Sequence, residues 1–170
     1  YGFYFWFPIM LKRQSSLSDL LVGVLGMIPY ALMFAAMIFN GWHSDAHLER
    51  RWHAAVPNFI AAAGALALTA HFRSLPVSIL LFSTIALVNG FLPPFWAIPT
   101  TLLSRSGAAA AVGLINAIAS VAGFASPFLL GYLSTRTGSF DAGMDVVAGA
   151  GIAAGLLMLL VAITNGGDWG

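Results

Sequence analysis

The chain has 170 residues, of which 59% are hydrophobic and 8% are charged, with a mean hydropathy of +0.88 and a formal net charge of +1. Soluble domains carry about 25% charged residues, so this composition excludes an ordinary soluble fold. No basic stripe is present to bind nucleic acid, and the absence of cysteine excludes disulfides and thiolate metal sites. The apolar residues form runs of bilayer-spanning length, which predicts an integral membrane protein.

The chain opens with an aromatic segment, residues 1–11, that is too short to span a membrane. Such a helix measures about 16 Å against a hydrocarbon core of about 30 Å. The segment lacks the basic start and the small-residue cleavage site of a signal peptide, and it has no initiator methionine. We therefore expect the end of a helix whose beginning lies outside this sequence. In the polar loop that follows, Ser18 or Asp19 is placed to cap the next helix.

Five segments have the length and composition of membrane-spanning helices. We expect them at residues 20–42, 54–72, 76–103, 108–133 and 142–163. The third is longer than a bilayer requires and contains Pro93, Pro94 and Pro99, so it should be kinked or tilted. With the short first helix, these spans predict an all-α membrane protein. Lysine and arginine residues lie on both faces, so the positive-inside rule does not orient the chain.

The proline-rich stretch of the third span carries Trp96, and the next span carries the amide Asn116. A short turn joins the two spans, and both residues should lie about 12–15 Å from the same membrane face at about 1.5 Å of rise per residue. A broken helix that presents an indole beside an intramembrane amide is a way to build half of a polar-substrate site. Two alternatives remain open. Asn116 can instead bond a neighbouring helix, for about 0.6–2 kcal/mol, and Trp96 can be a packing or interface residue.

Two helix ends share a short pattern, Gly-Trp-His-Ser at residues 41–44 and Gly-Tyr-Leu-Ser at residues 131–134. Three helices separate the copies, and an odd number places them on opposite membrane faces. This is the signature of an inverted 3+3 helix repeat. A match this short also arises by chance, so the pattern alone leaves the repeat open.

Residues 41–53 hold the densest cluster of charge, and we expect a loop there. One interpretation is a solvated turn. The other is a gate in which Asp45 lies near a helix N-terminus, where the helix dipole favours its charge. The spacing of His43 and His47 suggests zinc superficially, but the sequence has no His-Glu-x-x-His pattern, so we predict no metal site.

Several segments resemble the C-terminal half, helices seven to twelve, of a major facilitator superfamily transporter, and specifically its anion:cation symporter branch of tartrate, phthalate and sugar-acid carriers. They are residues 1–8, 41–53, 95–99 and 113–127. The likeness covers nearly the whole chain. It implies that residues 1–170 form a six-helix half-domain whose N-terminal partner half is missing, and that residues 41–53 form a cytoplasmic gating loop.

Within that loop, the residues that match the superfamily's gating motif are Gly41, Asp45, Arg50 and Arg51. Ala46 stands where an arginine is usual, which puts the full charge relay of the motif in doubt. The resemblance further implies that Trp96 and Asn116 contact a bound organic anion, with Tyr4 as a third contact. The proton-coupling acids and the main carboxylate-binding arginine are expected in the missing half.

The implied function is secondary active transport of a small organic anion, by proton symport and alternating access, in the inner membrane of a bacterium. No cofactor and no enzymatic activity are implied, and the partners are membrane lipid, the anion and the missing half. A serine protease of the membrane would need a Ser and a His facing each other at depth. The four histidines instead lie at or near predicted helix ends. A non-transporting membrane assembly protein remains the alternative, and it predicts that Trp96 and Asn116 tolerate substitution.

Overall fold

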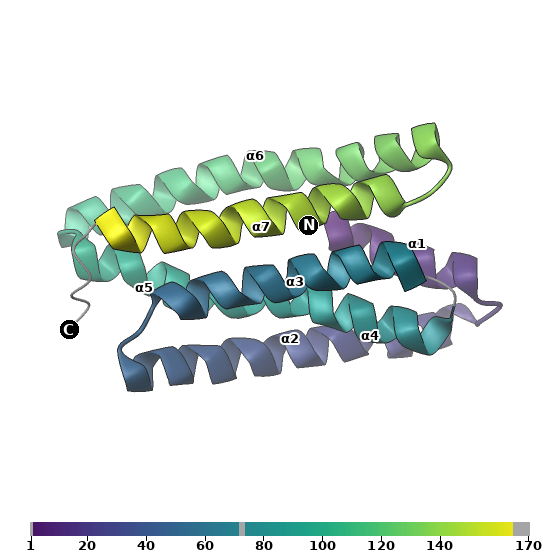
Figure 1. Ribbon diagram of the computed structural model, residues 1–170, viewed down its shortest axis with the longest axis horizontal. Coiled ribbons are helices and arrows are strands. Elements are labelled where there is room, and N and C mark those ends of the chain that lie inside the picture. Colours follow the sequence, from purple (N-terminus) through teal and green to yellow (C-terminus); the bar gives the residue numbers. More distant parts are fainter. Residues whose placement is uncertain (1, 72–73, 165–170) are drawn as a thin grey trace.

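The computed structural model describes residues 2–71 and 74–164, with side chains for residues 6–13, 15–70 and 74–160. Within these ranges every regular element is a helix. The elements are α1 (Gly2–Gln14), α2 (Asp19–His47), α3 (Arg51–His71), α4 (Leu75–Ala86), the 3₁₀ segment η1 (Leu87–Phe91), α5 (Leu92–Leu102), α6 (Arg105–Thr137) and α7 (Asp141–Thr164). They run along one common direction as a bundle (Figure 1). The all-α prediction is confirmed.

Five helical stretches of the described chain are long and apolar enough to cross a membrane, and they match the five predicted spans to within a few residues. The largest difference is at the end of α2. We predicted that this helix ends at Trp42, but it continues to His47, so most of the expected loop at residues 41–53 is helical. Only residues 48–50 separate α2 from α3. The start of α2 is as predicted, because Ser18 Oγ accepts a hydrogen bond from Leu21 N at 3.3 Å.

The third span is broken, as its prolines predicted, but the break lies just before them. The chain changes from α-helix to 3₁₀-helix over η1 and returns to α-helix in α5. Pro93 and Pro94 occupy the first turn of α5, where a missing N–H costs little. Asn89 and Gly90 therefore lie in the break itself, at the point where α5 can be aimed independently of α4.

The helices pack in a reciprocal pattern. The first triplet is α1, α2 and α3, and the second consists of the broken span α4–η1–α5, α6 and α7. The first member of each triplet packs on the second member of the other, so that α1 contacts α6 and α2 contacts the broken span. The third members, α3 and α7, pack on each other. Exchanging the triplets leaves these three contacts unchanged, as an inverted repeat predicts. The symmetry is incomplete, because α3 also packs on α4 and η1, whereas α7 and α1 are not in close contact in the described chain.

The two triplets also keep the same register. Each second helix ends in a residue with positive φ, Leu48 at 52° and Gly138 at 74°, and these are the two positive-φ residues of the described chain. The third helices begin at Arg51 and Asp141. Members of each pair lie 90 positions apart in the sequence (48 and 138, 51 and 141).

The glycines of the shared sequence pattern have equivalent contacts. A Cβ at Gly41 of α2 would lie 3.0 Å from Pro93 Cβ of α5. A Cβ at Gly131 of α6 would lie 2.9 Å from Trp6 Cζ2 of α1. Each glycine, again 90 positions apart, thus lets its helix approach the first helix of the other triplet. The six-helix bundle built from an inverted 3+3 repeat is confirmed.

Burial is unevenly distributed over the bundle. Half of the most apolar part of α3 is buried, compared with 11% for α2 and none for α6. On α7, a Cβ at Gly151 would lie 3.0 Å from Asn58 O, and a Cβ at Gly155 would lie 2.6 Å from the ring of Phe59. The Gly-x-x-x-Gly face of α7 therefore packs on α3 within the chain, whereas α2 and α6 keep apolar faces open.

Candidate functional site

Trp96 and Asn116 lie on neighbouring helices, as predicted, since α5 and α6 contact each other. Trp96 follows the first turn of α5, is half-buried, and meets the ring of Phe95 edge-on with centroids 4.9 Å apart. Asn116 is exposed near the middle of α6, and its Nδ2 donates to Val112 O of the same helix at 3.0 Å. In the described chain, the ring contact of Trp96 with Phe95 and the hydrogen bond of Asn116 both lie within the helix that carries the residue.

This geometry bears on the alternative in which Asn116 joins two helices of the bundle. The hydrogen bond of its side-chain amide stays within α6, and the side chain is exposed in the described chain. Ser120, one turn further on, is also exposed and bonds Asn116 O at 2.8 Å. Asn116 therefore presents a polar group, with Ser120 beside it, on an open helix face, where it can meet a molecule from outside this bundle.

Tyr4 lies on α1 by its backbone, but its side chain is outside the described part of the chain. Its role as a third substrate contact stays a prediction.

The corner between α2 and α3 is closed by a charged pair. Arg50 bonds Asp45 through Nη1, and the same nitrogen donates to Ser44 Oγ at 3.0 Å. Ser44 in turn donates to Glu49 O at 2.6 Å. Our expectation that Asp45 lies near a helix N-terminus is wrong. It lies in the last turn of α2, where the dipole disfavours a carboxylate, so its charge is balanced by Arg50 instead.

The carboxylate at the start of α3 is Glu49, one of the charges of residues 41–53, to which we assigned no capping role from the sequence. It accepts from Trp52 N at 2.7 Å and from His53 N at 3.2 Å, and so bonds amides that have no partner within the helix. Partial burial raises the pKa of Glu49, but these bonds and the one from the His53 ring outweigh it. The pKa of Glu49 therefore lies below its ordinary value of 4.5.

Two histidines extend this cap across the corner. His53 Nδ1 lies 2.6 Å from Glu49 Oε2, and His53 Nε2 lies 2.6 Å from His43 Nδ1 of α2. His47 Nδ1 bonds His43 O at 2.9 Å. One proton between the two facing nitrogens satisfies both imidazoles, whereas a second would set two N–H donors against each other. No group of three or more metal-ligating side chains with a metal-binding arrangement occurs among the residues that the structure describes.

Arg51, the other cation expected in the gate, does not join this network. It begins α3, and its guanidinium carbon lies 5.7 Å from the ring centroid of Trp52. Its Nε is buried without a hydrogen-bond partner in the described chain. The structure therefore brings together Asp45 and Arg50 of the four predicted gate residues, while Gly41 packs on α5 and Arg51 stacks on an indole.

Asn40 is a further polar residue that we missed in the sequence. Its Nδ2 donates to His53 O at 2.8 Å and to Gly90 O at 2.7 Å. One amide thus joins α2 to both α3 and η1. Its position directly before Gly41, on an apolar span, was the available signal.

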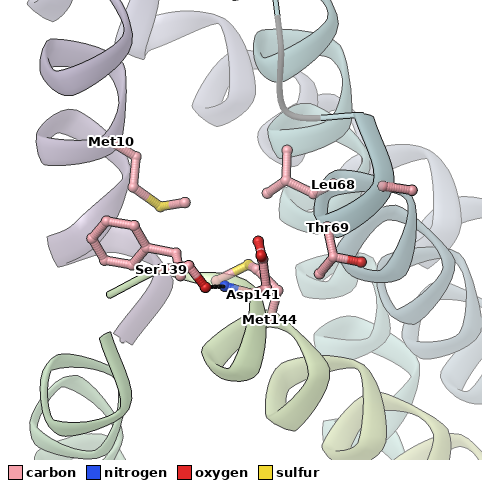
Figure 2. A pocket seen from close by; sticks show the side chains of 8 residues that line it. Met10, Leu68, Thr69, Ser139, Asp141 and Met144 are labelled. Carbon is pink, nitrogen blue, oxygen red and sulfur yellow. Dashed lines mark hydrogen bonds between the residues drawn. The ribbon is translucent and has the colours of Figure 1, made fainter. Parts of the chain in front are cut away.

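Figure 2 shows a cavity of about 350 Å³. It lies at the end of α3, whereas the corner between α2 and α3 lies at the start of that helix. Its walls come from the end of α1, the end of α3 and the start of α7, with Met10, Leu68 and Met144 pointing toward it. Ser139 Oγ accepts from Asp141 N at 3.2 Å there. The hydrogen bond between these two polar residues therefore helps to start α7. Neither Trp96 nor Asn116 lines the cavity.

The comparisons with known proteins agree with this architecture. The family model described as Major Facilitator Superfamily matches residues 1–127. A putative tartrate transporter of Agrobacterium vitis is 34% identical over 165 residues, covering 95% of this chain and 38% of the relative. The putative metabolite transport protein NicT of Pseudomonas putida is 34% identical over 161 residues, covering 94% of this chain and 37% of the relative.

A more distant relative is the probable galactarate/D-glucarate transporter GudP of Bacillus subtilis, with 25% identity over 95% of this chain and 37% of the relative. No solved structure matches the chain. The chain spans just over a third of the length of the relatives that it matches. These relatives are named as transporters, not as enzymes. With five helices in its described residues that are long and apolar enough to span a membrane, and with its inverted repeat, the chain is a multi-pass membrane protein that belongs to the major facilitator superfamily.

Proposed function

We propose that this chain forms one six-helix half of a secondary active transporter that carries a small organic anion by proton symport. The observation that carries the proposal is Asn116, an exposed amide at the middle of a membrane-spanning helix, with its side chain bonded to its own helix. A polar group is costly on a face that meets only lipid. It is well placed on a face that lines a path for a polar substrate.

The open faces of α2 and α6 support a second half as the partner. None of the most apolar part of α6 is buried within the chain. Its large apolar side chains are exposed, with Phe124 at 85% and Phe128 at 75%. The chain spans just over a third of its relatives, so a further set of helices in the complete carrier would cover these faces and enclose the space in front of Trp96 and Asn116.

The substrate class follows from the relatives and from the site chemistry. Two of the relatives reported above are named for tartrate and for galactarate or D-glucarate, which are dicarboxylates that carry hydroxyl groups. The Asn116 amide can donate to a carboxylate and accept from a hydroxyl, and the Trp96 indole can donate and can cover an apolar edge. This half supplies orientation, and the cation that balances the anion would come from the other half.

The proton-coupling group is also assigned to the other half. The acidic side chains in the described chain, Asp19, Asp45, Glu49, Asp141 and Asp145, all lie within five residues of a helix end. None of these described acids lies at the depth of Asn116, where a coupling carboxylate would act. During transport the break at η1 would let α5 tilt, and the corner held by Asp45 and Arg50 would open and close on one side of the membrane.

The test uses the complete carrier in proteoliposomes, with radiolabelled tartrate as the probe. Asn116→Ala and Trp96→Phe should each reduce uptake, and Asn116→Ala should weaken tartrate binding about tenfold or more, since a hydrogen bond to a charged group contributes about 1.5–3 kcal/mol. Thr135→Val is the matched control on α6, because Thr135 is exposed and bonds its own helix through Gly131 O at 2.9 Å. It should transport normally. Full uptake by both site variants, with the protein folded, would remove the site assignment and favour an assembly protein.

A further inference from the structure

We propose that Asn40 is a positioning residue whose single amide replaces hydrogen bonds that prolines have removed from two helices, and thereby fixes the broken span to the corner between α2 and α3. The relevance to transport rests on the proposed function, whereas the structural role does not.

The two carbonyls that Asn40 bonds lack their usual partners. In an α-helix, the carbonyl of residue i accepts from the N–H of residue i+4. For His53 that residue is the buried Pro57, which has no N–H. For Gly90, the residues at i+3 and i+4 are Pro93 and Pro94, so that neither a 3₁₀ nor an α-helical bond can form. Inside a membrane bundle, a carbonyl left without a partner is costly.

Asn40 supplies both missing donors. A primary amide has two N–H groups, and the Nδ2 of Asn40 lies 2.8 Å from His53 O and 2.7 Å from Gly90 O. The side chain is half-buried on α2. An interior amide that served packing alone would have no reason to reach two carbonyls on two different elements, each of them freed by a proline.

The surrounding backbone confirms that three elements meet at this point. A Cβ at Gly90 would lie 3.7 Å from both Ala36 O of α2 and Pro57 Cγ of α3. One residue beyond Asn40, a Cβ at Gly41 would lie 3.0 Å from Pro93. The close approach leaves the broken span little room to move along α2 while both amide bonds are intact.

The two bonds lead to the two functional regions of this half. His53 belongs to the corner between α2 and α3, because its ring bonds Glu49 and His43. Gly90 lies in the break that directs α5 and therefore Trp96. A tilt of α5 must either carry the corner with it or exchange one of the bonds of Asn40. Asn40 thus couples the direction of the substrate helix to the state of the corner.

Proline replacement gives a specific test, because alanine restores the missing N–H. In the complete carrier, hydrogen–deuterium exchange is measured at residues 87–92 and 51–56, for Asn40→Ala alone and together with Pro57→Ala and Pro94→Ala. Asn40→Ala alone should speed exchange about five- to tenfold, as loss of one hydrogen bond predicts. In the proline-replaced background the same change should speed it less than twofold. Asn40→Asp keeps the shape but removes the donors when ionised, and should behave as Asn40→Ala.

Asn58→Ala is the matched control. Asn58 is a buried amide whose Nδ2 bonds Ala54 O of its own helix at 2.8 Å, so its effect should be equal in both backgrounds. An Asn40→Ala effect of equal size in both backgrounds would overturn the proposal, and so would no effect at all. If Asn40→Ala alone does not fold, the triple variant should still fold, and its failure to do so would also overturn the proposal.

Tartrate uptake separates this proposal from the proposed function. Asn40→Ala should lower the maximal rate about five- to tenfold while KM changes less than twofold, and the proline replacements should recover part of the rate. If exchange responds as expected but the parent carrier moves no substrate, the positioning role stands and the proposed function fails. If uptake falls without any change in exchange, the positioning role fails and the proposed function stands.

Discussion

Replacing Leu48 by glycine should stabilise the protein. Leu48 ends α2 with a φ of 52°, a left-handed conformation that costs a residue with a Cβ about 1–2 kcal/mol. Its N–H bonds Asp45 O at 3.4 Å, as a helix cap of this kind requires. The conformation is therefore needed to turn the chain into α3, and glycine adopts it without the steric cost.

The net gain is smaller than the relief of strain. Glycine is more flexible in the unfolded chain, which offsets about 0.5–1 kcal/mol. Leu48 is 61% exposed, so its removal sacrifices little burial. The net stabilisation is then about 0.5–1 kcal/mol, which corresponds to a rise in Tm of about 1–4 °C for a domain of this size. Thermal unfolding of the purified protein, followed by tryptophan fluorescence, measures this shift.

Gly138 provides the matched control at the equivalent position of the second triplet. Its φ is 74°, and an added Cβ would meet nothing within 4 Å, so Gly138→Ala tests the backbone term alone. We expect this substitution to lower Tm by about 1–4 °C. The reasoning is refuted if Leu48→Gly lowers Tm, or if the two substitutions shift Tm in the same direction.

Two further predictions concern the packing of α7 and the cap of α3. Gly151→Leu should destabilise the bundle by about 1–3 kcal/mol, because an added Cβ lies 3.0 Å from the backbone oxygen of Asn58. The control is Gly149→Leu, which has open space at the Cβ and should lower the stability clearly less in the same thermal unfolding experiment. Equal losses would contradict the packing argument. The pKa of Glu49 is lowered on folding, so its contribution to stability is fully present above its ordinary pKa of 4.5 and is lost as the pH falls through the lower folded value. Tm measured against pH should therefore fall more steeply below pH 4.5 in the parent than in Glu49→Gln, and identical profiles would contradict this role.

The helices themselves could be predicted because their signals are local. Uninterrupted apolar runs defined the five spans, the hydroxyl of Ser18 marked the start of α2, and the cluster of prolines marked the break in the third span. In the sequence the repeat was visible only as a short glycine pattern. That Gly41 and Gly131 both allow a close approach between helices became clear only once the neighbouring helices were known.

The corner between α2 and α3 was less predictable, and the reasons are physical. Nothing in the residues after Gly41 prevents them from being helical. The residue that ends α2 in the left-handed conformation is Leu48, whereas a glycine at this position would have indicated the helix end in the sequence. The error over Asp45 followed from that misplaced end. The positions of Pro57 and Pro94 reveal which carbonyls lose their helical donors, but not which side chain replaces them. Asn40 lies 13 positions from His53 and 50 from Gly90, so its role depends on tertiary packing.

The reciprocal packing of the two triplets has a consequence for biogenesis. One partner of α1 is α6, and one partner of α3 is α7, which begins 70 positions after α3 ends (71 and 141). At about 5–20 residues per second, the ribosome completes the second triplet several seconds after the first has entered the bilayer. During that interval, α1 and α3 must remain in lipid, or beside the insertion machinery, with their packing faces uncovered. A nascent chain that stops before α6 should therefore be a target for membrane quality control, even though its first three helices have all been inserted.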